Sequence, residues 1–302
     1  PSSDLTFGIA LAMSSSLAIG SSFIVKKKGL KLASARGGLR AGSGGFGYLR
    51  EPLWWGGMIT MIVGEVANFA AYAYAPAVIV TPLGALSIIV AAVLSHHILR
   101  ERLNGFGWLG CFLCVVGSLS VVMHAPEDRP IRDVRQLWEM ASAPTFATYA
   151  AFATCLTSYL ITSVYPRVGE KVLVVPIGIC SLAGSLSVMG VKALGIALRL
   201  TWAGSNQFAY AETWACVAVV AACVVTQMNY LNKALDVFNA AVVTPVYYVG
   251  FTTLTLLASS VMFKDYERQS AVEVTSQLCG FATILSGVFV LHVTKDVRAG
   301  GM

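Results

Sequence analysis

The sequence predicts an all-α membrane protein of about nine transmembrane helices, with its N-terminus outside the cell and its C-terminus in the cytoplasm. Apolar residues make up 56% of the 302 residues and charged residues only 12%, about half the charged share of a soluble globular chain. A domain of this size with so few charges cannot cover its surface for water. The composition therefore excludes a soluble protein, and a series of long apolar runs locates the helices.

Each of these runs is long enough to cross a bilayer, which takes roughly 20 mostly apolar residues. Ser, Thr and Gly residues within them favour close helix packing in lipid, so we expect one bundle, a single transmembrane domain over residues 1–302. The predicted helices lie near 5–25, 53–74, 77–98, 105–124, 145–164, 172–198, 208–231, 237–262 and 273–293.

The basic residues predict the orientation. They are densest directly after the first apolar run, and the positive-inside rule places that segment in the cytoplasm. The cluster has no nucleic-acid motif beside it, so no nucleic-acid partner is expected. Contact with anionic lipid is open for the three consecutive lysines, although a plain cytoplasmic-loop anchor is the interpretation we favour. The segment holds Lys26, Lys27, Lys28, Lys31, Arg36, Arg40 and Arg50.

Two stretches indicate an internal repeat. Residues 68–82 and 229–245 each begin with an asparagine, Asn68 or Asn229, and each end in Thr-Pro. Later helices share a glycine spacing, because Gly110 and Gly117 correspond to Gly280 and Gly287. The alternative is a chance likeness between glycine-rich helices.

The alternating topology gives the two copies opposite orientations. The repeat halves are approximately 5–124 and 145–293, joined by an extracellular loop at 125–144. Inverted repeats of this kind occur in transporters, whose substrate site lies near the midplane.

Glu65 is the strongest candidate for function, because a charge near the middle of a membrane helix costs roughly 2.5–3.5 kcal/mol on insertion scales. Asn68 at i+3 and Tyr72 at i+7 share its helix face. Carboxylate and amide oxygens suit Mg²⁺ or a proton. The alternative is a protonated or hydrogen-bonded structural glutamate. Asn229, the repeat counterpart of Asn68, and Gln227 complete the predicted ion-binding set, with Glu65, Asn68 and Asn229 as the metal ligands.

Other polar or helix-breaking residues are candidates for a cavity or a gate. Membrane-embedded prolines free backbone carbonyls that a water-lined cavity can satisfy, although a static kink explains each one equally well. The intramembrane lysine is a counter-charge, a gate or, as we favour, a snorkelling side chain. This set contains Ser15, Ser22, Ser185, Lys192, Glu212, Pro82 and Pro245.

Motifs for enzymatic chemistry are missing from the sequence. It has no P-loop, no G-x-S-x-G and no H-E-x-x-H. Its seven cysteines lie within the apolar runs and form no disulfide framework. We therefore expect neither an enzyme nor a bound cofactor.

The chain resembles the NIPA family of magnesium transporters, and through it the drug/metabolite transporter superfamily. The resemblance covers nearly the whole chain and is carried by residues 14–30, 64–76, 81–86, 101–104, 190–195, 227–235 and 291–296. It implies an inverted-repeat bundle that lacks one N-terminal helix, Mg²⁺ as the transported ion, and the plasma and endosomal membranes of a eukaryotic cell. The family's motif glutamate and asparagines would be Glu65, Asn68 and Asn229.

We therefore expect alternating access through a central cavity, driven by the ion gradient and the membrane potential. The expected partners are Mg²⁺ and the lipid bilayer, and a homo-oligomer is left open. Two alternatives remain: a carrier for an organic metabolite, and a membrane scaffold or regulator that transports nothing.

Overall fold

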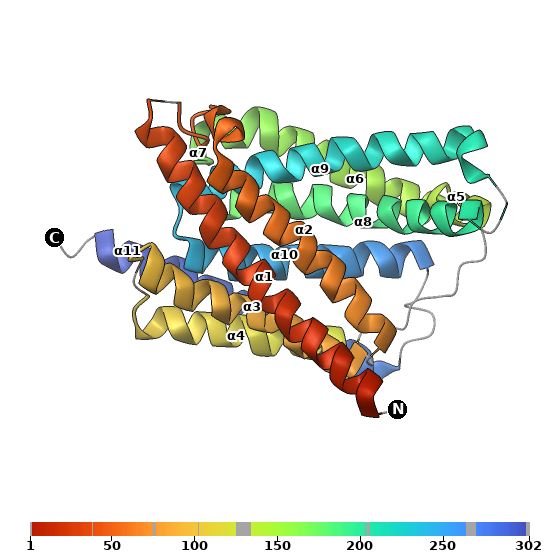
Figure 1. The fold of residues 1–302 in the computed structure, drawn as a ribbon, viewed down its shortest axis with the longest axis horizontal. Helices are drawn as coiled ribbons and strands as arrows, with labels where there is room; N and C mark the ends of the chain where they lie inside the picture. The colour runs from red at the N-terminus through yellow and green to blue at the C-terminus, as the bar shows by residue number, and fades with distance from the viewer. Residues whose placement is uncertain are drawn as a thin grey trace. The chain divides into compact units, whose positions relative to one another are not determined.

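A computed structural model describes residues 2–37, 39–74, 77–101, 103–124, 134–202, 204, 206–263 and 270–299. Within these residues all regular secondary structure is helical (Figure 1). Each predicted apolar run coincides with a long helix. These helices are α1 (Ser2–Ala35), α2 (Pro52–Tyr74), α3 (Ala77–Ile98), α4 (Gly105–Met123), α6 (Pro144–Tyr159), α8 (Val174–Trp202), α9 (Ala211–Val237), α10 (Ala240–Phe263) and α11 (Ala271–Ala299).

Short helical elements join the long ones. They are η1 (Gly47–Arg50), α5 (Val134–Ala141), η2 (Leu160–Val164), α7 (Tyr165–Val168) and η3 (Gln207–Ala209). Helix α5 occupies part of the predicted loop 125–144, and residues 125–133 of that loop lie outside the described residues.

Helix α1 is longer than predicted. It continues ten residues beyond the expected end at residue 25, because no proline or turn signal interrupts the lysine-rich segment, and Gly37 follows its end at φ +85°. Lys26, Lys27, Lys28 and Lys31 therefore belong to the helix, and their assignment to a loop is wrong.

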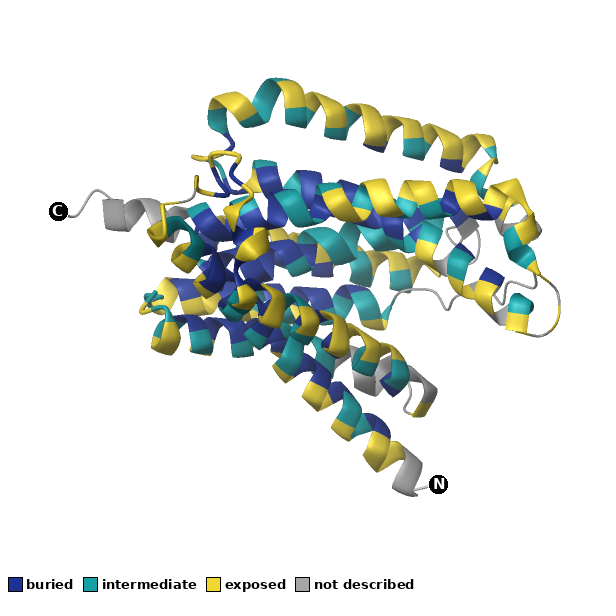
Figure 2. Ribbon diagram, turned by 45° about the horizontal axis from the view of Figure 1, so that its top comes forward, coloured by how far each residue is buried: buried dark blue, intermediate teal, exposed yellow. Residues whose placement is uncertain are grey.

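The described helices identify an integral membrane protein. Seven segments are long and apolar enough to cross a membrane. Large apolar side chains such as those of Phe69 and Phe152 are exposed, and Figure 2 shows exposed residues along the helices, where lipid would cover them. Helix α2 is not among the seven, and α3 contributes only the shorter apolar helix Leu86–Ile98. Nine spans and the N-out orientation therefore stay predictions. The seven segments are Leu5–Ala35, Gly105–Met123, Pro144–Val168, Val174–Trp202, Ala211–Val237, Ala240–Met262 and Ala271–Leu291.

The chain forms two compact units, and each is described by itself. Unit 1 comprises Pro1–His124, Asn232–Val249 and Thr275–Met302, and unit 2 comprises Ala125–Leu231 and Gly250–Val274.

In unit 1, α1 packs along α2 and α3 through small residues. A Cβ atom at Gly29 would lie 2.7 Å from the backbone nitrogen of Trp54, and one at Gly64 would lie 2.8 Å from Cγ1 of Ile19. Both glycines thus permit backbone approach at distances that no other residue allows.

Helices α4 and α11 pack together through paired glycines. A Cβ atom at Gly110 would lie 2.9 Å from the carbonyl oxygen of Gly287, and one at Gly117 would lie 2.7 Å from that of Gly280. Gly110, the earlier glycine of α4, contacts Gly287, the later glycine of α11, and Gly117 contacts the earlier Gly280. The two helices therefore run antiparallel.

Substitution of Gly117 by alanine is expected to lower the free energy of unfolding by about 1–3 kcal/mol, the usual cost of overpacking a tight contact. The added methyl group would meet backbone atoms of α11, which cannot move aside as a flexible side chain could. Thermal unfolding in detergent measures the change. Gly105→Ala on the same helix is the control, because a Cβ atom there meets nothing within 4 Å. Equal melting temperatures for the two variants would contradict the packing.

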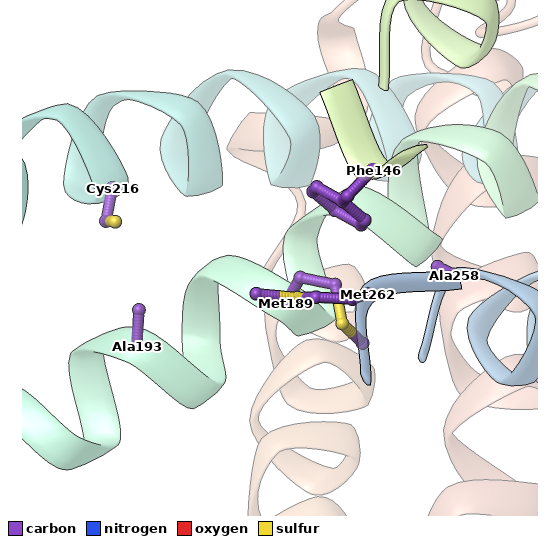
Figure 3. Packing of buried hydrophobic residues seen from close by; sticks show 6 residues of the cluster. All are labelled: Phe146, Met189, Ala193, Cys216, Ala258 and Met262. Atoms are coloured by element: carbon purple, nitrogen blue, oxygen red, sulfur yellow. The ribbon is translucent and has the colours of Figure 1, made fainter. Parts of the chain in front are cut away.

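Unit 2 is held together by a buried apolar cluster between α6, α8, α9 and α10. Figure 3 shows Cys216 of α9 pointing toward Ala193 of α8, and Met189 and Met262 lying beside each other. The members are Phe146, Met189, Ala193, Cys216, Ala258 and Met262.

A π-helical turn, η2, joins α6 to α7. Pro166 explains it, because a proline lacks the N–H group and its ring would clash with the carbonyl group of Thr162 in a regular α-helix. The extra residue in the turn removes that conflict.

Candidate functional site

The candidate site in unit 1 lies where α2 packs against α1. Helix α2 presents one stripe of residues to α1, with Gly57 against Lys26, Gly64 against Ile19 and Ala71 against Ala12. These contacts fix an antiparallel register. As one moves forward along α2, the facing residue on α1 moves back by the same number of positions. Ser15 therefore lies opposite Asn68.

Glu65 is exposed and directly follows Gly64, the residue of this stripe that contacts Ile19. Its neighbours Ile62, Val66 and Phe69 are exposed apolar residues. In the described helices, every other Asp or Glu lies in a first or last turn. Glu65 is therefore the mid-helix acid that sequence reasoning predicted, and a bilayer would favour it only with a counter-charge or a water-lined path.

Asn68 contributes an amide oxygen with unused hydrogen-bonding capacity. Its Oδ1 atom is buried and has no hydrogen-bond partner among the residues that the structure describes. A buried polar atom left without a partner costs stability, so such atoms in native proteins call for an explanation. A bound cation or a water molecule would supply the missing partner.

The two predicted serines of α1 are buried. Ser15 Oγ donates to the carbonyl oxygen of Ala12 at 2.8 Å, and Ser22 Oγ donates to that of Ile19 at 2.6 Å. A hydroxyl group that donates its proton in this way keeps its oxygen lone pairs for a ligand. Ser15, opposite Asn68, is thus placed to add a further oxygen.

Lys26 is a residue of this site that sequence reasoning missed. Its side chain has no exposed surface, its Nζ atom lies 2.9 Å from the sulfur of Met61, and it stands 4.8 Å from the ring centroid of Phe23. Contact of Lys26 and Lys27 with anionic lipid is therefore excluded, while Lys28 remains exposed. The sequence around Lys26 contains no proline or turn signal, and this could have indicated that the helix continues through the lysine.

The remaining predicted ligands lie in unit 2 on α9. Gln227 is buried, and its carbonyl oxygen accepts from Cys180 Sγ at 3.3 Å. Asn229 is half-buried. Ser185 of α8 is also buried and lies 2.9 Å from the hydroxyl group of Tyr149.

Several predicted residues lie partly outside the description. The structure gives the helical backbone of Tyr72, Pro82 and Lys192, but their side chains fall outside the described residues. Glu212 is exposed in the first turn of α9, and Pro245 is buried inside α10.

A second set of polar groups in unit 1, which we call the charged cluster, centres on Glu101. Its Oε1 atom lies 2.6 Å from the ammonium group of buried Lys27 and 3.2 Å from that of Lys31. Its Oε2 atom accepts from Ser95 Oγ at 3.0 Å and from the backbone nitrogen of Ala240 at 2.9 Å. Lys27 also donates to the carbonyl oxygen of Phe238. The charged cluster thus ties α1 to the start of α10.

A neighbouring ion pair strengthens the same end of unit 1. Arg40 Nε lies 3.3 Å from Oδ2 of Asp236, which also accepts from the backbone nitrogen of Gly42 at 3.0 Å. Trp54 donates to the side-chain oxygen of Asn232 at 3.1 Å. The loop after α1 is therefore fastened to the end of α9.

The pKa of the Glu101 carboxyl lies below its ordinary value. Burial, the largest single influence, acts in the opposite direction. It is outweighed by the Lys27 ammonium group, by hydrogen bonds from Lys27 and from the backbone of Ala240, and by Lys31. The carboxylate form is therefore the one that the fold stabilises.

We expect the stabilisation from Glu101 to persist at mildly acid pH. Because the folded-state pKa is the lower one, the contribution is fully present above the ordinary glutamate pKa of about 4.3 and is lost as the pH falls through the lowered value. The difference in melting temperature between wild type and Glu101→Gln should stay constant down to roughly pH 5. A difference that vanishes near neutral pH would contradict the lowered pKa.

Among the residues that the structure describes, no three His, Cys, Asp or Glu side chains come together as a metal site. The neighbouring oxygens of the same helix pair are the amide of Asn68, one turn along α2 from Glu65, and the hydroxyl of Ser15, opposite Asn68. Oxygen donors of this kind suit a hard cation that retains part of its water shell.

Known proteins match the chain over nearly its full length. The family model described as Magnesium transporter NIPA matches residues 3–297. The probable magnesium transporter NIPA3 of Arabidopsis thaliana is 62% identical over 299 residues, which cover 99% of this chain and 81% of that protein. A probable magnesium transporter of Candida albicans is 50% identical over 293 residues, with coverage of 97% and 80%. No solved structure matches the chain.

Proposed function

Because the chain belongs to the magnesium transporter NIPA family, we propose that it carries Mg²⁺ across the membrane by alternating access, down the ion's gradient and the membrane potential. The observation that carries this proposal is the mid-helix carboxylate of Glu65, one turn from the Asn68 side-chain oxygen, which has no hydrogen-bond partner in the described part of the chain. The protein is a transporter and not an enzyme.

Glu65, Asn68 and Ser15 suit Mg²⁺ because this ion dehydrates reluctantly and is usually held by one or two carboxylates while keeping several waters. One carboxylate with neutral oxygens holds a partly hydrated ion without trapping it. Gln227, Asn229 and Tyr72 remain the further ligands that the sequence predicts.

No source of chemical energy is needed for entry. A membrane potential contributes roughly 2.3 kcal/mol per charge for each 100 mV, and thus about twice that for a divalent ion. An inside-negative potential therefore drives Mg²⁺ inward strongly, in keeping with the missing nucleotide-binding motif.

Nine spans, the N-out/C-in orientation and the inverted repeat are part of the proposal. The glycine contacts of α4 and α11 support the repeat. In the repeat, Gly110 corresponds to Gly280 and Gly117 corresponds to Gly287. A two-fold axis that exchanges corresponding residues would turn the observed contact 110–287 into the observed contact 117–280, as expected for two related halves. Residence in the plasma and endosomal membranes is proposed from the family resemblance.

Uptake of Mg²⁺ into liposomes that contain the purified protein tests the function. We expect uptake well above that of empty liposomes when Mg²⁺ is supplied outside only. Folded protein that gives no uptake would refute the proposal, and would favour an organic-solute carrier or a non-transporting regulator.

Replacement of Asn68 by leucine is expected to separate stability from transport. The apolar side chain removes a buried oxygen for which the described residues supply no hydrogen-bond partner, so the melting temperature should stay equal or rise. Mg²⁺ uptake should fall about tenfold, the effect of losing one ligand interaction worth roughly 1.4 kcal/mol. A variant that is less stable but transports normally would show that Asn68 is structural.

A further inference from the structure

We propose that the junction between α9 and α10, residues 232–240, is a gate that closes one end of the transport path and is released in each transport cycle. The inference rests on the proposed function, because alternating access requires one end of the carrier to open while the other is closed. It assigns which contacts part at this end and which contacts stay.

Polar groups hold the junction to the first of the two predicted repeat halves. Glu101 Oε2 accepts from the backbone nitrogen of Ala240 at 2.9 Å, and Ser95 Oγ lies 3.5 Å from Oδ1 of Asn239. The further pairs are Lys27 with the carbonyl oxygen of Phe238, Arg40 with Asp236, and Trp54 with Asn232. All of these residues belong to unit 1. The junction is thus a contact between the two repeat halves, made of charges and hydrogen bonds.

The contact between α4 and α11 joins the same two repeat halves in a different way. A Cβ atom at Gly110 or at Gly117 would lie 2.9 or 2.7 Å from a carbonyl oxygen of α11. Helix α4 contains no charged residue. Parting two such helices would lose their close packing, and water could not replace it. We therefore assign this contact as the joint that stays closed.

The ionic contacts of the junction can part at a smaller cost. Lys27 and Glu101 lose most of their hydration when they pair, and this loss offsets much of their attraction. Water can return to both charges when the junction leaves, because the neighbouring Lys31 and Arg40 side chains are 49% and 58% exposed. The backbone N–H group of Ala240, at the start of α10, can be hydrated as well. These pairs are therefore suited to separate and to form again.

The junction lies at one end of α2, and the ion site lies farther along the same helix. Trp54, which donates to Asn232 of the junction, is in the first turn of α2. Glu65 lies about three turns beyond it, roughly 16 Å along the helix. The gate therefore stands between this end of unit 1 and the site, and it is closed in this structure.

A reversible cross-link tests the gate. Ser95→Cys and Asn239→Cys are introduced together, in a chain whose exposed cysteines Cys155 and Cys279 are replaced by serine. Oxidation then joins α3 to the junction across the 3.5 Å contact, and the cross-linked fraction is measured in the same liposomes as Mg²⁺ uptake. We expect oxidation to lower uptake at least about tenfold, because the gate cannot open, and reduction of the disulfide to restore it.

The pair Ser120→Cys and Ser276→Cys is the matched control, because Ser120 of α4 donates to the carbonyl oxygen of Ser276 of α11 at 3.3 Å. Its disulfide also joins the two repeat halves, but across the contact that stays closed, so uptake should stay within about twofold. Unchanged uptake after oxidation of the Ser95–Asn239 pair would overturn the inference, and so would an equal block by both disulfides. Protein that gives no uptake before any cross-linking would instead refute the proposed function.

Thiol modification tests the opening without transport. Ser95 is fully buried, so Ser95→Cys should react with a water-soluble maleimide only when the gate opens. Asp236→Asn removes an ion pair between the halves, and we expect it to speed the reaction about tenfold, equivalent to roughly 1.4 kcal/mol.

Glu51→Gln is the control for this measurement. The Glu51 carboxylate is as buried as that of Asp236 and also pairs with an arginine, Arg36, but both partners lie in the first repeat half. It should leave the rate of modification unchanged. Equal rates in the Asp236→Asn and Glu51→Gln variants would overturn the inference even where uptake is observed.

Discussion

The Glu65→Gln variant is expected to insert into the membrane and to lose Mg²⁺ uptake by about a hundredfold or more, the effect of at least roughly 2.7 kcal/mol of lost attraction. The substitution keeps the size of the side chain and removes its charge. A unit charge pair about 4 Å apart is worth roughly 4 kcal/mol near a protein surface, and a divalent ion doubles that value. The amide oxygen that replaces the carboxylate can recover only part of it.

Uptake by purified protein in liposomes measures the loss, with the amount of inserted protein determined in the same vesicles. Glu139→Gln serves as the matched control, because Glu139 is an exposed acid on the short helix α5. It should transport at the wild-type rate. A Glu65→Gln protein that inserts normally and transports at the full rate would remove Glu65 from the ion site.

The second large effect is expected at the charged cluster, where Glu101→Gln should lower the free energy of unfolding by about 3–5 kcal/mol. The Lys27 side chain is only 3% exposed, so loss of the carboxylate leaves a buried ammonium group with the Phe238 carbonyl oxygen as its described acceptor. The substitution also removes a negative charge from the start of α10, where it complements the helix dipole.

Thermal or denaturant unfolding in detergent measures this change. Lys31→Met provides the comparison within the same cluster, because the Lys31 side chain is 49% exposed and its ion pair with Glu101 is 3.2 Å long. An exposed pair of this kind contributes about 0–1 kcal/mol. If Glu101→Gln costs no more than Lys31→Met, the buried pair does not hold α1 to α10 as described.

The helices could be predicted because each one is a long run of apolar residues, and such a run is visible in neighbouring residues of the sequence. Glu65 could be found for the same reason, since a carboxylate in the middle of such a run is conspicuous. The end of α1 was misplaced because consecutive lysines were interpreted as leaving the membrane. Their burial depends on Met61 and Glu101, which are distant in the sequence and become neighbours only through packing.

The partners of polar side chains were the least predictable feature. Asp236 binds Arg40, and Asn232 binds Trp54, across nearly two hundred residues of chain. No pattern of neighbouring residues in the sequence predicts such contacts. The spacing of Gly110, Gly117 and Gly280 indicates a repeat in the sequence, but only the structure shows that these glycines lie in the contact between α4 and α11.

The dependence of wild-type Mg²⁺ uptake on an imposed membrane potential tests the central claim most directly. Liposomes that contain the purified protein would be held at a series of inside-negative potentials with equal Mg²⁺ on both sides. Potential-driven transport of a divalent ion predicts accumulation that rises about tenfold for each 30 mV or so, as two charges per ion require. Accumulation that is absent, or that does not change with the potential, would contradict it.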